Sequence, residues 1–155
     1  MEFIKKDIRV DGDSSLFDDA EYLHGIGFVA GQRYIASVCG TLNLRKKDKW
    51  DALLIGPKPN DGITYASVVN AAANYWKHSD ERDFSKLNDQ QERTRKAIES
   101  VGVAVSEYEG CVTTNIMHQL SLNKFSDLAA ILKDRSVAVL DWKSKATLSQ
   151  EIVYE

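Results

Sequence analysis

Two asparagines and a histidine recur at a spacing of four residues, as Asn70, Asn74 and His78. In an α-helix this spacing places the three side chains on one face, and Lys77 and Glu81 lie beside them. Asparagine is a poor helix former because its amide competes for backbone hydrogen bonds, whereas solvated helix faces more often carry lysine, glutamate or glutamine. The polar row therefore needs a structural or a chemical reason.

Two interpretations of the row remain open. In the first, Asn70 and Asn74 hydrogen-bond across a helix pair inside a bundle, or are simply solvated. In the second, they line a site in which His78 acts as an acid, a base or a ligand. The candidate catalytic residues are then His78 and Asn74, and the candidate binding residues are Asn70, Lys77 and Glu81.

Other patterns that signal a metal or a nucleophile are missing from the sequence. His24, His78 and His118 lie in three separate segments, and no HxxxH pair supplies two ligands from one helix. Neither Cys39 nor Cys111 belongs to a CxxC pair, so both are expected to be small buried hydrophobes. The sequence contains no GxSxG elbow. We therefore expect no metal and no cofactor.

Composition excludes several classes of partner. The 155 residues are 43% hydrophobic and 28% charged, and 20 basic residues against 23 acidic ones give a net charge of -3. A chain with this balance has no overall positive field to attract nucleic acid or an anionic membrane. No stretch is apolar over the length that a bilayer crossing requires, and the N-terminus lacks the core of a secretory signal. We expect a cytoplasmic protein that makes no membrane contact.

The longest periodic segment runs from about Leu16 to Leu42 and predicts a long helix. Gly27 and Gly31 lie one turn apart in it, which favours the close approach of a neighbouring helix. The spacings of three and four in this segment predict a buried face made of Leu16, Ala20, Leu23, Gly27, Ala30, Tyr34 and Val38.

Four more helices follow from capping and periodicity. We expect a second helix over 63–78 that Asp61 or Thr64 caps, and a third that starts at a capping box of Asp89 with Glu92. A fourth is expected over 107–120, and a fifth that Ser126 caps. Segment 56–62, which holds both prolines, and segment 79–88 are predicted loops.

The fold class predicted from these elements is all-α. Residues 1–155 form one helical domain, a bundle of about five helices. Segment 137–142 fits a strand as well as a helix, and segment 150–155 forms an isolated strand or frays, so a short C-terminal strand stays open. The residues predicted to be largely buried are Leu23, Ala30, Tyr34, Val69, Ala73, Trp76, Ile98, Leu128 and Ile131.

The segment Asn70-Ala-Ala-Ala-Asn74-Tyr-Trp-Lys77-His78, with Asp80 and Glu81 after it and a long glycine-punctuated helix before it, resembles the helical core of HEPN-type proteins. The resemblance covers residues 18–82. It implies a small all-α bundle of the kind found in bacterial toxin–antitoxin and phage-defence systems. Many members of that class are metal-independent ribonucleases that work as dimers.

The resemblance departs from the family at the catalytic signature, an arginine and a later histidine with four to six residues between them. For His78 the arginine positions hold Ala71, Ala72 and Ala73, and neither His24 nor His118 satisfies the signature. Phosphodiester cleavage needs a cation that stabilises charge on the phosphate as well as a group that moves protons. The departure favours a function other than catalysis.

Two functional hypotheses follow. The first is a cytoplasmic helical interaction domain that acts in a bacterial conflict or phage-defence system by binding a protein or nucleic acid. The alternative is a metal-independent HEPN-like ribonuclease with a divergent site around His78 and RNA as its substrate. We also expect a homodimer, because small residues such as Gly27, Ala30 and Gly31 allow helices to pack closely across a two-fold axis.

Overall fold

Helices make up the regular structure of the chain. The computed structural model describes residues 15–79, 83–106 and 110–151, and the side chains of these ranges from Asp18 to Ala146. It contains six helices and no strand in these ranges, so the predicted all-α bundle is confirmed. The helices are α2 (Ser15–Thr41), α3 (Lys46–Leu53), α4 (Tyr65–Lys77), α5 (Asp89–Glu99), α6 (Val112–Gln119) and α7 (Phe125–Glu151).

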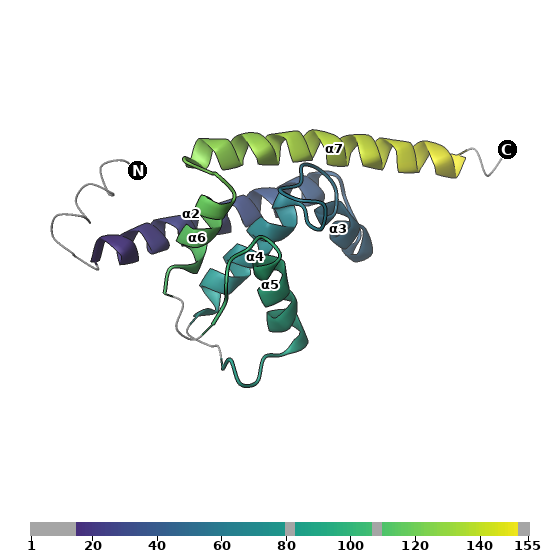
Figure 1. The fold of residues 1–155 in the computed structure, drawn as a ribbon. Coiled ribbons are helices and arrows are strands. Elements are labelled where there is room, and N and C mark those ends of the chain that lie inside the picture. The colour runs from purple at the N-terminus through teal and green to yellow at the C-terminus, as the bar shows by residue number, and fades with distance from the viewer. Residues whose placement is uncertain (1–14, 80–82, 107–109, 152–155) are drawn as a thin grey trace.

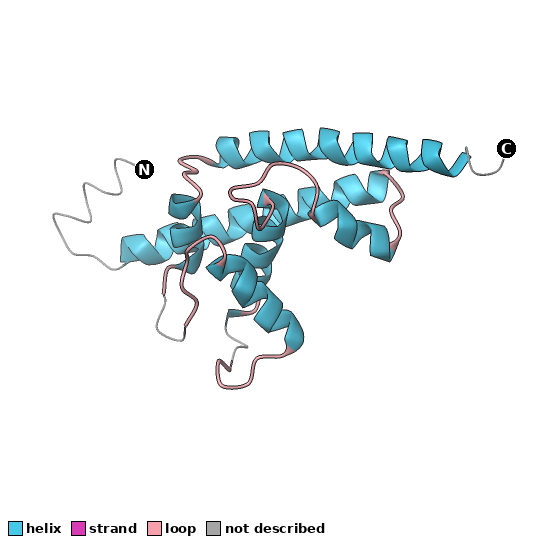
Figure 2. Cartoon of the chain, turned by 45° about the vertical axis from the view of Figure 1, so that its right-hand side comes forward, coloured by secondary structure: helices cyan, strands magenta, loops and turns pink. Residues whose placement is uncertain are grey.

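Two 27-residue helices, α2 and α7, form the long axis of the molecule. They run side by side in the same direction, and each is about 40 Å long at 1.5 Å per residue (Figure 1). Helix α4 packs most extensively against α2, and α5 packs on α4. Helices α4 and α5 extend below α2 in the view of Figure 1, α6 crosses α2 in that view, and α7 lies above α2; Figure 2 shows the same chain from another side.

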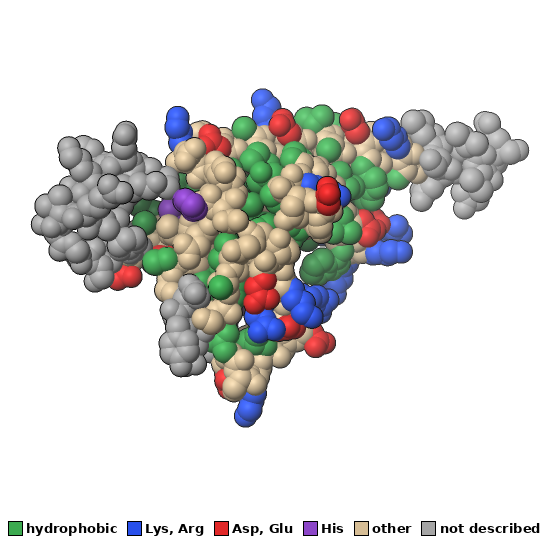
Figure 3. Space-filling view, in the orientation of Figure 1, with side chains coloured by type: hydrophobic (Ala, Val, Ile, Leu, Met, Phe, Trp, Pro, Cys, Tyr) green, Lys and Arg blue, Asp and Glu red, His purple; other side chains and the backbone are tan. Residues whose placement is uncertain are grey.

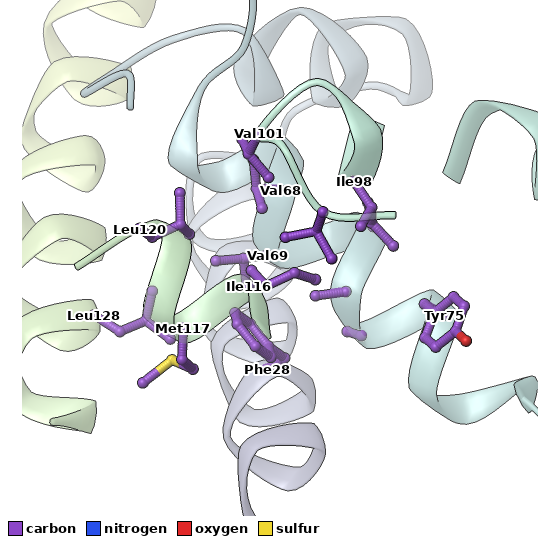
Figure 4. Packing of buried hydrophobic residues seen from close by; sticks show 14 of the residues in the cluster. Phe28, Val68, Val69, Tyr75, Ile98, Val101, Ile116, Met117, Leu120 and Leu128 are labelled. Atoms are coloured by element: carbon purple, nitrogen blue, oxygen red, sulfur yellow. The ribbon is translucent and has the colours of Figure 1, made fainter. Parts of the chain in front are cut away.

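The main core forms where α2, α4, α5 and α6 meet, and α7 closes one side (Figure 4). Phe28 of α2 and Val69 of α4 are fully buried there, together with Ile98 of α5 and Ile116 of α6. A second, smaller cluster near the end of α2 joins it to α3 and α7. Its buried members are Cys39, Leu44, Ala52 and Val139.

The buried face of α2 is shifted by one position along the sequence from the predicted face. The face that enters the core carries Phe28, Gly31, Ile35 and Cys39, all buried, whereas Leu23 is 56% and Tyr34 is 41% exposed. Ala30 is exposed as well, whereas Ala20 is buried as predicted, and the side chain of Leu16 lies outside the described part. The prediction failed because α2 has apolar residues on most of its circumference, so periodicity alone does not select a face.

The remaining burial predictions held unevenly. Val69, Ala73, Ile98 and Leu128 are buried as expected. Trp76 and Ile131 are only half-buried. The Trp76 indole covers Gly25, where an added Cβ would lie 2.1 Å from its Nε1, and Tyr22 packs edge-on against it at 5.4 Å between ring centroids. Trp76 therefore packs at the edge of the contact between α2 and α4, against Gly25 and Tyr22.

The backbone carbonyl of Leu53 links the end of α3 to the start of α4. Thr64 is the N-cap of α4, as one of the two predicted options, and its hydroxyl accepts from Ser67 N at 3.1 Å. The hydroxyls of Thr64 and Ser67 both donate to Leu53 O, at the last residue of α3. The helical segment α3 was not predicted as a separate element, because its lysines interrupt the hydrophobic pattern.

Arg135 of α7 holds the other side of α3. Its side chain is 1% exposed, and Nη2 donates to Ala52 O at 2.9 Å, near the negative end of the α3 dipole. Its stem lies against Gly56, where an added Cβ would be 2.8 Å from Arg135 Cγ. Gly56 has a φ of +111°, which favours glycine, so the close contact and the backbone both require this residue.

The caps of α5 and α6 correct two predictions. The capping box of α5 pairs Asn88 with Gln91, one residue before the predicted pair of Asp89 with Glu92. Both pairs have suitable residue types, and the sequence does not distinguish them. Helix α6 begins at Val112 rather than 107, and residues 107–109 lie outside the described part of the chain.

The last helix is longer than expected. α7 begins at Phe125, so Ser126 lies inside its first turn rather than at its cap, and the Asp127 carboxylate accepts from the backbone N–H groups of Asn123 and Lys124. Segment 137–142 is helical, and α7 continues to Glu151. Residues 150 and 151, the start of the segment predicted to form a strand or to fray, are therefore helical, and residues 152–155 lie outside the described part.

Candidate functional site

The polar row of α4 meets Gln32 of α2, and together they form what we name the amide cluster: Gln32, Asn70, Asn74 and Lys77. Gln32 Nε2 donates to Asn70 Oδ1 at 2.8 Å and to Asn74 Oδ1 at 2.9 Å. Lys77 Nζ donates to Gln32 Oε1 at 2.7 Å. This is the cross-helix hydrogen bonding of the first interpretation, and it explains why asparagine occurs twice in a helix interior.

Lys77 fixes the orientation of the amide groups. An ammonium group has no acceptor, so the Gln32 atom that faces Lys77 must be the carbonyl oxygen. The nitrogen of Gln32 then faces the two asparagines, which must present their oxygens. Among the described residues the Asn70 side-chain nitrogen has no hydrogen-bond partner, so it keeps two unused donors.

The structure does not place all five predicted site residues in the cluster. Asn70, Asn74 and Lys77 belong to it. His78 is the C-cap of α4, with an exposed side chain and a φ of -118°. Glu81 lies outside the described residues.

A hollow of about 450 Å³, which we name the cationic groove, lies between α2 and α3. Gln32 and Asn70 of the amide cluster line one part of it. Its rim carries Arg33 of α2 and Lys46 and Lys49 of α3, all three exposed. The sequence pattern does not indicate the groove, because Lys46 and Lys49 lie outside the periodic apolar segments and far along the chain from Asn70.

The groove combines these cations with an apolar lining. Val29 and Ala36 of α2 and Leu53 of α3 line it, and Cys39 is buried there. Trp50 of α3 lines it too and is 57% exposed. Among the described residues, no acidic side chain lines the groove.

The cations of the groove differ from the basic residues of α5. Over α5, acidic and basic side chains are intermingled in Figure 3. There Arg95 pairs with Glu92 at 2.8 Å, and Lys96 lies 3.7 Å from the same carboxylate. The basic residues of α5 are therefore paired with acidic residues of the same helix and do not form an isolated positive patch.

An apolar face, distinct from the cationic groove, runs along α2 and α7. A hollow of about 370 Å³ between the two helices is lined by Ala30 and Tyr34 of α2 and by Phe125 and Ala129 of α7, among others. Helical spacing places further exposed apolar side chains beside it. We define the apolar face by Leu23, Ile26, Ala30, Tyr34, Phe125, Ala129 and Leu140.

The titratable residues near α6 have a structural arrangement. Glu21 and His24, which share one side of α2, both reach α6. The Glu21 carboxylate accepts from the N–H groups of Thr113 and Thr114 at 2.8 Å each, and His24 Nδ1 lies 2.9 Å from Thr114 Oγ1. Burial lowers the pKa of His24 from its ordinary 6.5, while the nearby Glu21 charge acts in the opposite direction.

Within the described residues, no group of three or more His, Cys, Asp or Glu side chains is placed to hold a metal ion. Glu21 and His24 have the spacing of a two-ligand pair, yet both carboxylate oxygens of Glu21 already accept hydrogen bonds from backbone amides. Cys39 is buried, as predicted, and Cys111 is half-buried at the N-cap of α6. No helix of the described chain has the length and hydropathy needed to cross a membrane.

Comparison with protein-family models, with curated protein sequences and with solved structures finds no match to this chain. A proposal about the function of this chain therefore depends on the geometry of the chain itself.

Proposed function

We propose that this chain is a cytoplasmic helical interaction domain that binds other protein chains without catalysing a reaction, and that it forms a homodimer through the apolar face. The observation that carries the proposal is the exposure of large apolar side chains along α2 and α7. Leu23, Ile26 and Leu140 are each at least 46% exposed, and they lie beside an apolar hollow. Contiguous exposed apolar patches of this kind are typical of protein-binding surfaces.

The shape of the face suits a helix from a second copy. Ala30 and Ala129 are small and exposed, and they lie between the larger rings of Tyr34 and Phe125. Small residues between large ones let a partner helix approach closely. A two-fold axis at this position would place the same patch on both chains, as closed dimers require.

Charge substitutions on neighbouring alanines of α7 test the dimer. We expect the wild type to sediment as a dimer and Ala129→Glu to sediment as a monomer, because the new carboxylate would be desolvated at the interface. Ala130→Glu is the matched control, since Ala130 is exposed but does not line the hollow. A wild-type protein that remains monomeric at high micromolar concentration would overturn the dimer, as would dissociation by both substitutions.

Gly31→Leu is a poor test of the interface. Gly31 is buried, and an added Cβ would lie 3.0 Å from Val69 Cγ1 and 3.3 Å from Leu132 Cδ1. A leucine there would disrupt the monomer core, so loss of the dimer would have no specific meaning. Circular dichroism must accompany every interface variant for this reason.

The non-catalytic part of the proposal is tested with RNA. The amide cluster supports it, because Asn70 and Asn74 already serve as acceptors for Gln32. We expect labelled RNA incubated in EDTA to show equal background with wild type and with His78→Ala. Cleavage that His78→Ala abolishes would replace the proposal by a divergent HEPN-like ribonuclease. The HEPN-like resemblance supports a bacterial conflict or defence system as the setting of the interaction.

A further inference from the structure

We infer that the cationic groove between α2 and α3 is a second binding site, which takes an acidic amphipathic peptide segment of another protein. The carboxylates of the segment would meet Arg33, Lys46 and Lys49, and an apolar side chain would enter the lining of the groove. The site does not depend on the proposed dimer, because its residues of α2 are separate from those of the apolar face.

The groove is complementary in charge to an acidic segment. The described lining of the groove has three basic side chains and no acidic one, although the chain as a whole carries a net charge of -3. Arg33, Lys46 and Lys49 form no ion pair with any described residue, whereas Arg45, next to Lys46, pairs with Asp48 at 3.0 Å. Clustered cations of one sign steer and select a partner of the opposite sign.

The hydrogen-bonding groups of the groove also match carboxylates. The guanidinium and ammonium groups of the rim can only donate. Gln32 uses its side-chain N–H groups and its oxygen within the amide cluster, and the Asn70 oxygen also accepts there. The Asn70 nitrogen keeps its donors, so the side chains that line this groove offer more unused donors than unused acceptors. Carboxylates are acceptor-only groups and match such a site.

The apolar lining decides against nucleic acid. Val29, Ala36 and Leu53 have no side-chain acceptor for the N–H groups of a base, and a buried unpaired donor is costly. An aliphatic or aromatic side chain of a peptide leaves nothing unpaired there. Trp50, 57% exposed at the groove, offers the kind of aromatic anchor that is common at the centre of protein interfaces.

Selection from a random dodecapeptide library on phage tests the inference. The full chain is the target, and the triple variant Arg33→Glu/Lys46→Glu/Lys49→Glu is used for counter-selection. We expect the enriched peptides to carry a net negative charge and at least one large apolar residue. A synthetic copy of the leading peptide should bind the triple variant at least about tenfold more weakly than the wild type, and binding should weaken in high salt.

Two controls separate the groove from general charge and from folding. Lys58→Glu/Lys86→Glu/Lys124→Glu makes the same change of charge at exposed positions that do not line the groove, and it should leave peptide binding within about twofold. Trp50→Ala keeps all three cations and should also weaken binding, by about tenfold. Circular dichroism and thermal midpoints confirm that each variant is folded.

Several results would overturn the inference. These are enriched peptides without net negative charge, a failure to enrich any peptide over the triple variant, or an equal effect of the control triple variant. Tighter binding of a single-stranded RNA dodecamer than of the leading peptide, with the same dependence on Arg33, Lys46 and Lys49, would assign the groove to nucleic acid instead. Ala129→Glu should not affect peptide binding, so the dimer and the groove fail independently.

Discussion

The imidazole of His24 is half-buried between α2 and α6, with Phe125 at 5.8 Å between ring centroids. Burial lowers its pKa below 6.5, so the folded protein holds the neutral form and binds fewer protons than the unfolded chain near that pH. The contribution of neutral His24 to the free energy of unfolding is fully present above about pH 6.5. It is lost as the pH falls from there through the lowered pKa of the folded state.

We therefore expect the thermal midpoint of the wild type to fall as the pH is lowered from 7 toward 5, and His24→Gln to reduce this slope. His118→Gln is the matched control, because His118 is exposed in the last turn of α6. Proton NMR titration of the His24 ring provides the direct measurement. A ring that titrates above 6.5, or an equal slope in His24→Gln, would contradict the prediction.

Gly56 is the second residue with a measurable consequence. Its φ of +111° is unfavourable for other residues, and an added Cβ would press on the Arg135 stem. We expect Gly56→Ala to lower the free energy of unfolding by about 1–3 kcal/mol. Gly40→Ala is the control: nothing lies within 4 Å of its added Cβ, and alanine in α2 should stabilise by about 0.5–1 kcal/mol. Equal effects in urea unfolding would show that the Gly56 contact is misassigned.

At the scale of elements, α6 has a cap supplied by another helix. Its own N-cap, Cys111, makes no side-chain capping bond. The Glu21 carboxylate of α2 instead accepts hydrogen bonds from the backbone N–H groups of Thr113 and Thr114. A carboxylate at this position also interacts favourably with the helix dipole. This bond fixes α6 against α2, which a sequence-local cap cannot do.

We expect Glu21→Ala to destabilise the fold by about 1–2 kcal/mol, because two charge-assisted bonds and the dipole interaction are lost. Amide hydrogen exchange should speed up in α6 before it does in α4. Asp19→Ala removes an exposed carboxylate from the same helix and should change stability by less than about 0.5 kcal/mol. Equal losses for the two variants would argue against capping by Glu21.

At the scale of the whole molecule, α2 separates two environments. Phe28 faces the core where four helices meet, whereas Leu23 lies on the apolar face. We expect Phe28→Ala to cost about 3–5 kcal/mol in the free energy of unfolding. Leu23→Ala should cost about 0.5 kcal/mol or less when measured below the concentration at which the dimer forms. A larger loss for Leu23→Ala than for Phe28→Ala in chemical unfolding would support the buried face predicted from the sequence instead.

The sequence by itself determined the helical class, the bounds of α2 to within one residue and the loop at 56–62, and it narrowed the cap of α4 to Asp61 or Thr64. These features depend on local propensity and on hydrogen bonds between near neighbours, which residue order specifies. It also identified Asn70 and Asn74 as residues that need partners. It did not find Gln32, because 38 positions along the chain separate Gln32 from Asn70.

Only the tertiary structure decided which side of α2 enters the core, and which polar groups are left unused after folding. Leu23 and Phe28 are both large apolar residues, and the positions of α4 and α7 decide which of them is buried. The cationic groove likewise arises because α3 folds back beside α2, which brings Lys46 and Lys49 to Arg33. Burial and electrostatic proximity depend on contacts between distant segments, so a local pattern predicts the helices but not their shared surfaces.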